Sequence, residues 1–218
     1  MVLKLEPVRF ADRDIISRIF AQSFYAMRIQ QRLFPNVSLE DKTENAIKKW
    51  PFNYSRPNTA RQKIVNSETG EVVSYAAWEF FNIDASDLAT DISDMPEDCK
   101  MDEAPRSKGL DTIFAETVES QLARLDLELQ NLKTGQYMSL VTIGTIPKYQ
   151  GSGAGSIHMK WAAQVADEKR IPIYIEAAQE AVQFYMRHGY EVVKTVEVDM
   201  GAGDPIPYSM SAMTRQPT

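Results

Sequence analysis

The sequence predicts an α/β fold in which helices flank a mixed β-sheet of about seven strands. Apolar runs of strand length alternate along the chain with longer segments in which apolar residues recur every three to four positions. One such run, 136–146, leads through a glycine-rich loop into a helical pattern at 153–169. Two others, 61–66 and 71–80, flank a short turn that ends in Gly70, which predicts a hairpin. Strands interspersed with helices in this way indicate the α/β class.

The amino-terminal part begins with an expected strand at 3–8 and an expected helix at 12–28. Asp12 is a suitable N-cap for that helix. The apolar residues of its one face are Ile15, Ile16, Ile19, Phe20 and Phe24. A weaker helical pattern runs from about Leu39 to Trp50 and precedes the hairpin strands.

The carboxy-terminal part contains a long expected helix at 110–132. Its apolar stripe consists of Leu110, Phe114, Val118, Leu122, Leu125 and Leu129. After the strand 136–146 and the helix 153–169, the remaining expected elements are a strand at 171–176, a helix at 179–188 and strands at 190–198 and 208–214.

Between the hairpin and the long helix lies an acidic segment. Residues 82–104 carry eight Asp or Glu residues against one Lys. We expect an irregular insertion at about 82–109 that is mainly a solvated surface. Such a run could also attract a cationic amine.

Composition and charge exclude several classes of protein. With 218 residues the chain can remove about 70% of its unfolded surface from water. No linker or repeat divides it, so we expect one domain over 1–218. The net charge of −6 and the lack of a basic run argue against nucleic acid as a partner. Oligomeric state does not follow from sequence, and a homodimer is allowed.

Individual residues bear on localisation and metal binding. The first ten residues include Lys4, Glu6 and Arg9, which fits neither a signal peptide nor a membrane anchor. The lone Cys99 suits a reducing compartment, so we expect a cytoplasmic protein. His158 and His188 lack partners at metal-ligand spacing, and we expect no metal.

The loop at 149–156 carries the strongest chemical signal. It reads Tyr-Gln-Gly-Ser-Gly-Ala-Gly-Ser, and it joins the strand pattern directly to the start of a helix. The free N–H groups and the dipole of a helix N-terminus attract anions, and glycine lets a phosphate approach the backbone. We therefore expect a phosphate or diphosphate near residues 150–156. A flexible turn is the alternative interpretation.

Two other phosphate-binding loops fit less well. A P-loop requires a Gly-Lys-Ser/Thr ending, which this loop lacks. A Rossmann loop places a third Gly or Ala where this chain has Ser156, although Glu176 after the next strand could meet a ribose hydroxyl. Residues 147–150 also separate the strand from the glycines, which a Rossmann loop does not allow.

The chain resembles the GNAT acyltransferase superfamily. Gln150-Gly151-Ser152-Gly153-Ala154-Gly155 matches its Gln/Arg-x-x-Gly-x-Gly/Ala signature. The later segment 177–193, with Phe184-Tyr185 and then Gly189-Tyr190, is similar to the family's second block. The resemblance covers about residues 136–214, and the opening 7–12 is similar to the family's first strand and helix start.

The resemblance implies a GNAT-type sheet in which parallel strands 136–146 and 171–176 splay apart. It also implies acetyl-CoA as the acyl-donor substrate, with its pantetheine arm on the first of these strands. By this analogy the cofactor-binding residues are Ile143, Gly144, Thr145, Gln150, Gly151, Ser152, Gly153, Ala154, Gly155, Ser156 and Tyr185. Gly144 inside a strand independently suggests a bulge or a close backbone approach.

The resemblance also implies catalytic roles. Tyr185 stands at the family's tyrosine position and would protonate the leaving thiolate, although a packed aromatic side chain is the alternative. Glu79 or Glu176 are candidates for the general base, and ordered water could serve instead. Phe24, Phe34 and Trp78, with Tyr25, could line the acceptor pocket, although ordinary core positions are the alternative. The loop 201–207 could contribute to acceptor specificity.

Taken together, the sequence predicts an acetyl-CoA-dependent N-acetyltransferase. It would transfer an acetyl group to the primary amine of a small molecule, directly in a ternary complex. The alternative is a GNAT-fold coenzyme A-binding module without transferase activity, with a regulatory or scaffold role. A longer acyl chain would differ only in the volume beside the thioester.

Overall fold

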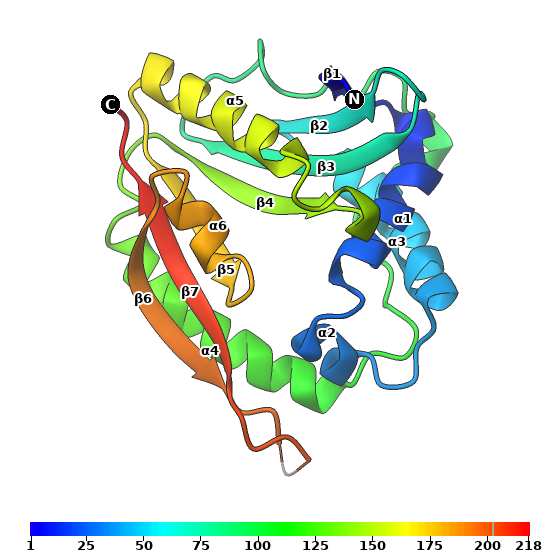
Figure 1. The fold of residues 1–218 in the computed structure, drawn as a ribbon, viewed down its shortest axis with the longest axis vertical. Coiled ribbons are helices and arrows are strands. Elements are labelled where there is room, and N and C mark those ends of the chain that lie inside the picture. The colour runs from blue at the N-terminus through cyan, green and yellow to red at the C-terminus, as the bar shows by residue number, and fades with distance from the viewer. Residues whose placement is uncertain (202) are drawn as a thin grey trace.

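A seven-stranded mixed sheet with the order β1-β2-β3-β4-β5-β7-β6 forms the centre of the computed structural model (Figure 1). The structure describes residues 1–201 and 203–218. The strands are β1 (Leu3–Pro7), β2 (Thr59–Asn66), β3 (Val72–Phe81), β4 (Tyr137–Thr145), β5 (Ile173–Ala178), β6 (Glu191–Val198) and β7 (Tyr208–Arg215). The predicted α/β class with a mixed sheet is confirmed.

The pairing of β4 with β5 divides this sheet into two parts. All other neighbours pair antiparallel, whereas β4 and β5 are parallel. Their register contains only two pairs, Met138 with Ile173 and Ser139 with Tyr174. Beyond Ser139 the two strands diverge, as the sequence led us to expect.

Helices cover both faces of the sheet. They are α1 (Arg13–Phe24), α2 (Arg28–Leu33), α3 (Leu39–Tyr54), α4 (Thr112–Gln130), α5 (Ala154–Lys169) and α6 (Val182–Met186). Successive side chains of a strand point to opposite faces. Trp78 of β3 accordingly packs beneath α5, whereas its neighbour Ala77 packs beneath α1 and α3. Helix α4 lies against β6 and β7 (Figure 1).

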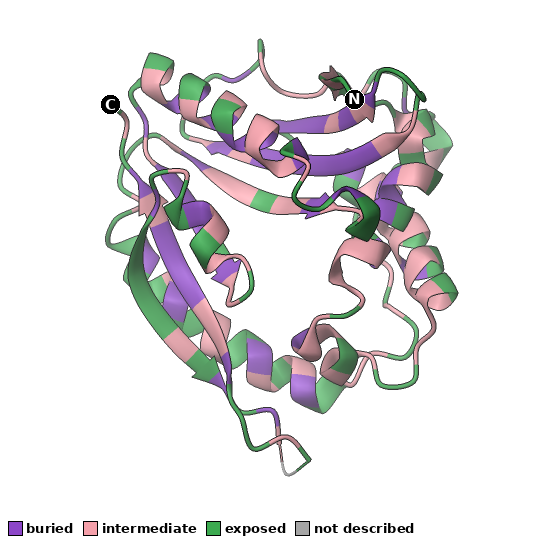
Figure 2. Cartoon of the chain, in the orientation of Figure 1, coloured by how far each residue is buried: buried purple, intermediate pink, exposed green. Residues whose placement is uncertain are grey.

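Burial differs between the strands of the sheet. Buried residues concentrate on β2, β3, β5 and β7, and the edge strand β6 is mostly exposed (Figure 2). Among the described residues, no helix combines the length and the apolar content that crossing a bilayer requires.

The first and third helices differ from expectation at their ends. The expected helix 12–28 stops at Phe24, and a separate short α2 follows. Helix α3 continues through Pro51 to Tyr54, although proline removes one helical hydrogen bond. Trp50 and Tyr54 are 3% and 0% exposed, so burial of these two aromatic rings offsets that loss.

Asp12 precedes α1 as predicted, but its carboxylate makes no capping bond to that helix. It accepts instead from the Arg9 N–H at 2.8 Å and from the Lys63 ammonium at 2.7 Å. The residue therefore ties the start of α1 to strand β2.

The acidic segment is irregular, as expected, but it is less solvated than predicted. Between β3 and α4 the described chain forms only a short 3-10 helix at Glu97–Cys99. Ala85 and Met95 are buried at 1% and 5% exposure. The Asp94 carboxylate accepts from the Tyr54 hydroxyl at 2.7 Å and from the Phe10 N–H at 2.8 Å. The segment thus packs against α3 and the start of α1.

One histidine lies fully inside the protein. His158 of α5 is 0% exposed, and its Nδ1 lies 3.3 Å from the Gln62 Oε1 of β2. Its Nε2 has no hydrogen-bond partner among the described residues. Burial lowers the pKa of His158 to about 3, because the interior disfavours the imidazolium. The folded protein therefore holds a neutral His158 at neutral pH.

This burial predicts a loss of stability in acid. Unfolding returns the pKa of His158 to about 6.5, so its contribution is complete above that pH and falls as pH drops toward 3. At pH 5 the loss of unfolding free energy amounts to about 2 kcal/mol. We expect the unfolding free energy of the wild type to fall by about that much more than that of His158→Met between pH 7.5 and 5. Parallel urea-denaturation results for the two proteins would contradict the assignment.

Candidate active site

The glycine loop between β4 and α5 leaves its backbone amides open. Gly151 and Gly153 have φ of 78° and 91°, a conformation that favours glycine. Gly153 is the N-cap of α5, and no side chain caps that helix end. The first helical N–H groups, those of residues 154–156, have no acceptor within the helix. No atom lies within 4 Å of where a Cβ of Gly151 or Gly153 would sit. The loop thus has the space and the donors that a diphosphate requires.

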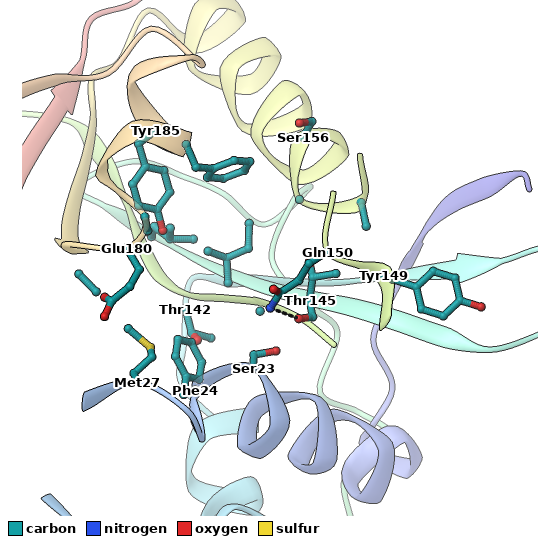
Figure 3. Close-up of a pocket in the computed structure, with 18 of the residues that line it drawn as sticks. Ser23, Phe24, Met27, Thr142, Thr145, Tyr149, Gln150, Ser156, Glu180 and Tyr185 are labelled. Atoms are coloured by element: carbon teal, nitrogen blue, oxygen red, sulfur yellow. Dashed lines mark hydrogen bonds between the residues drawn. The ribbon is translucent and has the colours of Figure 1, made fainter. Parts of the chain in front are cut away.

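A cavity of about 830 Å³ extends from this loop into the opening between β4 and β5. We call it the donor cavity, and Figure 3 shows side chains that line it. Of the predicted cofactor-binding residues, it is lined by Ile143, Gly144, Thr145, Gln150, Gly151, Gly153, Ala154, Gly155, Ser156 and Tyr185. Ser152 is the exception, and its hydroxyl oxygen is buried.

One edge of β4 presents backbone groups to the donor cavity. The Ile146 N–H donates to the Val73 carbonyl at 3.1 Å and so points toward β3. Backbone groups alternate sides along a strand, so those of Thr145 and Ile143 point away from β3. The Thr145 carbonyl indeed accepts from the Gln150 Nε2 at 3.3 Å on that side (Figure 3). Because β5 has diverged here, no strand pairs with this edge.

A β-bulge in β4 lies at the inner end of this edge. The register passes from Ala77 with Thr142 to Trp78 with Leu140, which leaves Val141 without a partner on β3. A bulge re-aims the backbone and frees local N–H and C=O groups from the ladder. Val141 could not be identified from the sequence, because a bulge depends on the pairing of two strands.

Gly144 marks a close approach of helix α1, one of the two roles its place in the strand suggested. A Cβ at Gly144 would lie 2.7 Å from the Ser23 Oγ and 2.9 Å from the Ser23 Cβ. Any side chain larger than hydrogen would therefore push α1 away from β4. Figure 3 shows Ser23 and Phe24 at this side of the cavity.

Tyr185 enters the donor cavity from α6, on the side opposite α1 (Figure 3). The residue is 4% exposed, and burial raises its pKa well above the usual value. The preceding Phe184 lies 3.1 Å from the Cβ position of Gly155, so that glycine lets α6 sit close to the loop.

A second cavity of about 510 Å³ lies between α1, α3 and the other face of the sheet. We call it the α1–α3 cavity. Phe24, Val141 and Thr142 line both cavities, so the two meet at the bulge of β4. The arrangement gives two ligands access to one point from different directions.

The predicted acceptor residues divide between this cavity and the core. Phe24 lines both cavities and Phe34 lines the α1–α3 cavity. Tyr25 lines neither, although its ring lies 5.3 Å from the Lys42 Nζ. Trp78 is 0% exposed beneath α5 and reaches neither cavity, as the core alternative expected.

The two candidate bases lie in different places. Glu79 lines neither cavity, and its carboxylate accepts from the Arg56 guanidinium at 2.7 Å. Glu176 lines the donor cavity, where partial desolvation and the nearby Asp126 raise its pKa. Glu176 is nevertheless exposed to solvent. The role of Glu79 stays a prediction.

Two further charged residues of the donor cavity were not identified from the sequence. Glu180 lines it and accepts from the Tyr208 hydroxyl, and Arg187 lines it from the end of α6. Arg187 lies two residues after Tyr185 in the segment 177–193, and its closeness to that predicted site residue was the available signal.

The loop 201–207 lines neither cavity in its described part. Ala202 of that loop lies outside the described residues. The Asp204 carboxylate accepts from the Arg28 guanidinium at 2.6 Å, which joins the described part of the loop to α2. A role of the loop in acceptor specificity stays a prediction. No group of three His, Cys, Asp or Glu side chains that could hold a metal occurs in residues 1–201 and 203–218.

Residues 122–190 match the sequence model of the Acetyltransferase (GNAT) family. The GNAT resemblance is confirmed. The matched segment contains β4, the glycine loop, α5, β5 and α6, which are the elements that build the donor cavity. No curated protein sequence matches the chain significantly.

Solved structures extend the GNAT likeness to the whole chain. A histone acetyltransferase HPA2 and related acetyltransferase from Corynebacterium glutamicum is 17% identical, with a TM-score of 0.61 over 100% of this chain and 98% of that one. The polyamine N-acetyltransferase of Drosophila melanogaster is 10% identical, with a TM-score of 0.62 over 99% of this chain and 100% of that one. Arylalkylamine N-acetyltransferase 2 from Aedes aegypti is 11% identical, with a TM-score of 0.63 over 100% of both. At these identities the likeness establishes the GNAT fold.

The contact between Gly144 and Ser23 predicts a measurable coupling. Gly144→Ala should destabilise the protein by about 1–3 kcal/mol, because the added methyl group overpacks the contact with α1. Adding Ser23→Gly removes both atoms that the methyl group meets. The double variant should therefore be more stable than the sum of the two single effects by about 1 kcal/mol, measured by denaturant unfolding. Strictly additive effects would show that α1 does not constrain position 144.

Proposed function

We propose that this protein is an acetyl-CoA-dependent N-acetyltransferase that acts on the primary amine of a small molecule. The observation that carries the proposal is the meeting of the two cavities at Phe24, Val141 and Thr142. One cavity ends in a loop suited to a diphosphate, and the other opens on a different face of the molecule. Direct transfer requires that donor and acceptor reach one point together, and this geometry supports it.

The open edge of β4 supports a position for the donor. The pantetheine arm of acetyl-CoA carries amide groups, and the Ile143 and Thr145 backbone groups would pair with them as an added strand does. The diphosphate would then fall on the amides of Gly151 and 153–156, since the Ser152 N–H donates to the Tyr149 carbonyl. A β4 backbone N–H near the bulge would donate to the thioester oxygen as negative charge develops there.

The reaction forms one bond and breaks another. The neutral amine nitrogen would attack the thioester carbon, so that a C–N bond forms as the C–S bond breaks. The nitrogen gives its extra proton to solvent or to a nearby base, and the departing thiolate takes a proton. Tyr185 would supply that proton, because its phenol is protonated at neutral pH and lies in the donor cavity, and its phenolate would then take a proton from solvent. The products are an N-acetylated amine and the free thiol of coenzyme A.

A negative charge added to the donor cavity tests whether the cavity binds coenzyme A. Ser156 lines the cavity in the first turn of α5. Ser156→Glu suits the helix dipole, so we expect unchanged or slightly higher stability without ligand. Its carboxylate should repel the diphosphate and weaken coenzyme A binding by at least about tenfold.

Thermal unfolding with coenzyme A provides the measurement. At 100 times the dissociation constant the ligand should stabilise the wild type by about 2.7 kcal/mol. Ser156→Gln, which has the same size without the charge, should retain most of that gain. If Ser156→Glu responded to coenzyme A like the wild type, the diphosphate would lie elsewhere.

A matched pair of tyrosines tests the proton donor. Tyr185→Phe should lower turnover about 100-fold and leave coenzyme A binding nearly unchanged, because only the hydroxyl is lost. Tyr190→Phe is the control, since the Tyr190 hydroxyl is buried without a partner among the described residues and lines neither cavity. Thiol release from acetyl-CoA with an amine panel measures both. Equal rates for Tyr185→Phe and wild type would remove Tyr185 from the mechanism.

The alternative function is a coenzyme A-binding module without transferase activity. It predicts a thermal shift with coenzyme A but no acetylated product from any amine. The intact loop together with a second cavity at the bulge favours the transferase, because a module that only binds coenzyme A needs no acceptor cavity.

A further inference from the structure

The α1–α3 cavity has an unusual distribution of charge. Its charged lining residues are Lys42, Lys49, Arg56 and Arg61, and no Asp or Glu among the described residues lines it. The whole protein carries a net charge of −6, so this concentration of cations opposes the average of the chain. A cavity with one sign of charge attracts ligands of the other.

Helix α3 supplies a polar stripe to this cavity. Lys42, Ala46, Lys49 and Asn53 follow the three- and four-residue spacing that places side chains on one helix face. Lys48, directly before Lys49, is exposed and lines neither cavity. The two lysines of the stripe therefore face inward, where a helix normally places apolar residues.

Three of the four cations lack a carboxylate partner. Arg56 pairs with Glu79 at 2.7 Å, but in the part of the chain that the structure describes no carboxylate lies within 4 Å of Lys42, Lys49 or Arg61. Lys42 donates to the Gln30 carbonyl at 3.1 Å. For Lys49 the described residues offer no hydrogen-bond acceptor.

Arg61 forms part of the cavity floor. It is 3% exposed, and its guanidinium donates to the carbonyl oxygens of Thr59, Asn53 and Arg56. A guanidinium has five N–H donors, so about two remain after these three bonds. Buried cations are costly unless an anion compensates them. Desolvation lowers the pKa of Lys42, Lys49 and Arg61, which shows that this cost is present.

We propose that the acceptor amine carries an oxyanion, a carboxylate or a phosphate, which Lys42, Lys49 and Arg61 bind. The inference rests on the proposed function, because it takes the α1–α3 cavity as the acceptor site. The anion lies toward α3 and the floor, and the amine of the same molecule faces the bulge at Val141. The cations also favour the neutral form of the amine, which is the form that attacks a thioester.

The rest of the lining indicates an apolar body between the two ends. Phe20, Phe24 and Phe34 line the cavity, and Phe20 is 40% exposed although it lies on a core helix. A purely cationic amine such as a polyamine would face four like charges and leave Lys42, Lys49 and Arg61 without a compensating anion. The structure therefore favours an amphiphilic amino acid-like molecule over a polyamine.

Matched pairs of amines test this inference. Phenylalanine against phenethylamine isolates a carboxylate, and 2-aminoethyl phosphate against ethanolamine isolates a phosphate. In at least one pair the anionic member should have the higher kcat/KM, by at least about tenfold, since one charged hydrogen bond is worth about that factor. The pair that shows the preference identifies the anion.

Variants of α3 then locate the effect. Lys49→Gln should lower kcat/KM for the anionic member at least about tenfold and leave that of the member without the anionic group unchanged. Lys48→Gln, the exposed neighbour, should change neither. No preference for the anionic member in either wild-type pair, or equal losses for both members in Lys49→Gln, would overturn the inference.

A binding measurement separates this inference from the proposed transferase. The probe is N-acetylphenylalanine, or 2-acetamidoethyl phosphate, titrated in the presence of coenzyme A. Binding that Lys49→Gln weakens would support the anion site even if no amine were acetylated, which would refute only the transferase. Acetylation of amines that lack an anionic group, with no binding of either probe, would support the transferase and overturn the anion site.

Discussion

The early divergence of β4 from β5 is the constraint on which both cavities depend. Two register pairs hold the strands together, and beyond them no strand within the described residues pairs with β4 on the β5 side. Backbone N–H and C=O groups inside a protein need hydrogen-bond partners, so an open strand edge beside a cavity is a site for an extended ligand. The bulge at Val141 lies where this edge begins, and it opens the same stretch of β4 to the opposite face.

The surrounding elements keep that opening in place. Gly144 lets α1 approach β4 closely enough to form a wall between the two cavities. Gly155 lets Phe184 bring α6 and Tyr185 to the far side of the donor cavity. Arg215 binds the Asp167 carboxylate through two bonds of 2.9 Å, which joins α5 to β7 on the other half of the sheet. This ion pair joins the two parts of the sheet at a place outside the gap between β4 and β5.

Sequence reasoning located the structural elements of the donor cavity that are local in the chain. The loop 150–156, its helix and Tyr185 lie in one stretch of chain whose glycines and spacing are visible in the sequence. It failed where distant segments combine. The cationic lining joins α3 to β2, and no periodicity connects Lys49 with Arg61. The sequence could not show which face of the sheet Trp78 and Glu79 occupy. A shift of the strand register by one residue moves every side chain to the other face. The continuation of α3 through Pro51 likewise depends on tertiary burial of Tyr54.

Amide hydrogen exchange of Ile143 and Thr145, with and without coenzyme A, tests the central claim most directly. Their N–H groups point into the gap, whereas that of Gly144 points toward β3 and serves as an internal reference. The account predicts that saturating coenzyme A slows exchange at Ile143 and Thr145 by at least about tenfold and changes Gly144 little. Unchanged exchange at both residues, with coenzyme A bound, would contradict the claim that the open edge of β4 receives the donor.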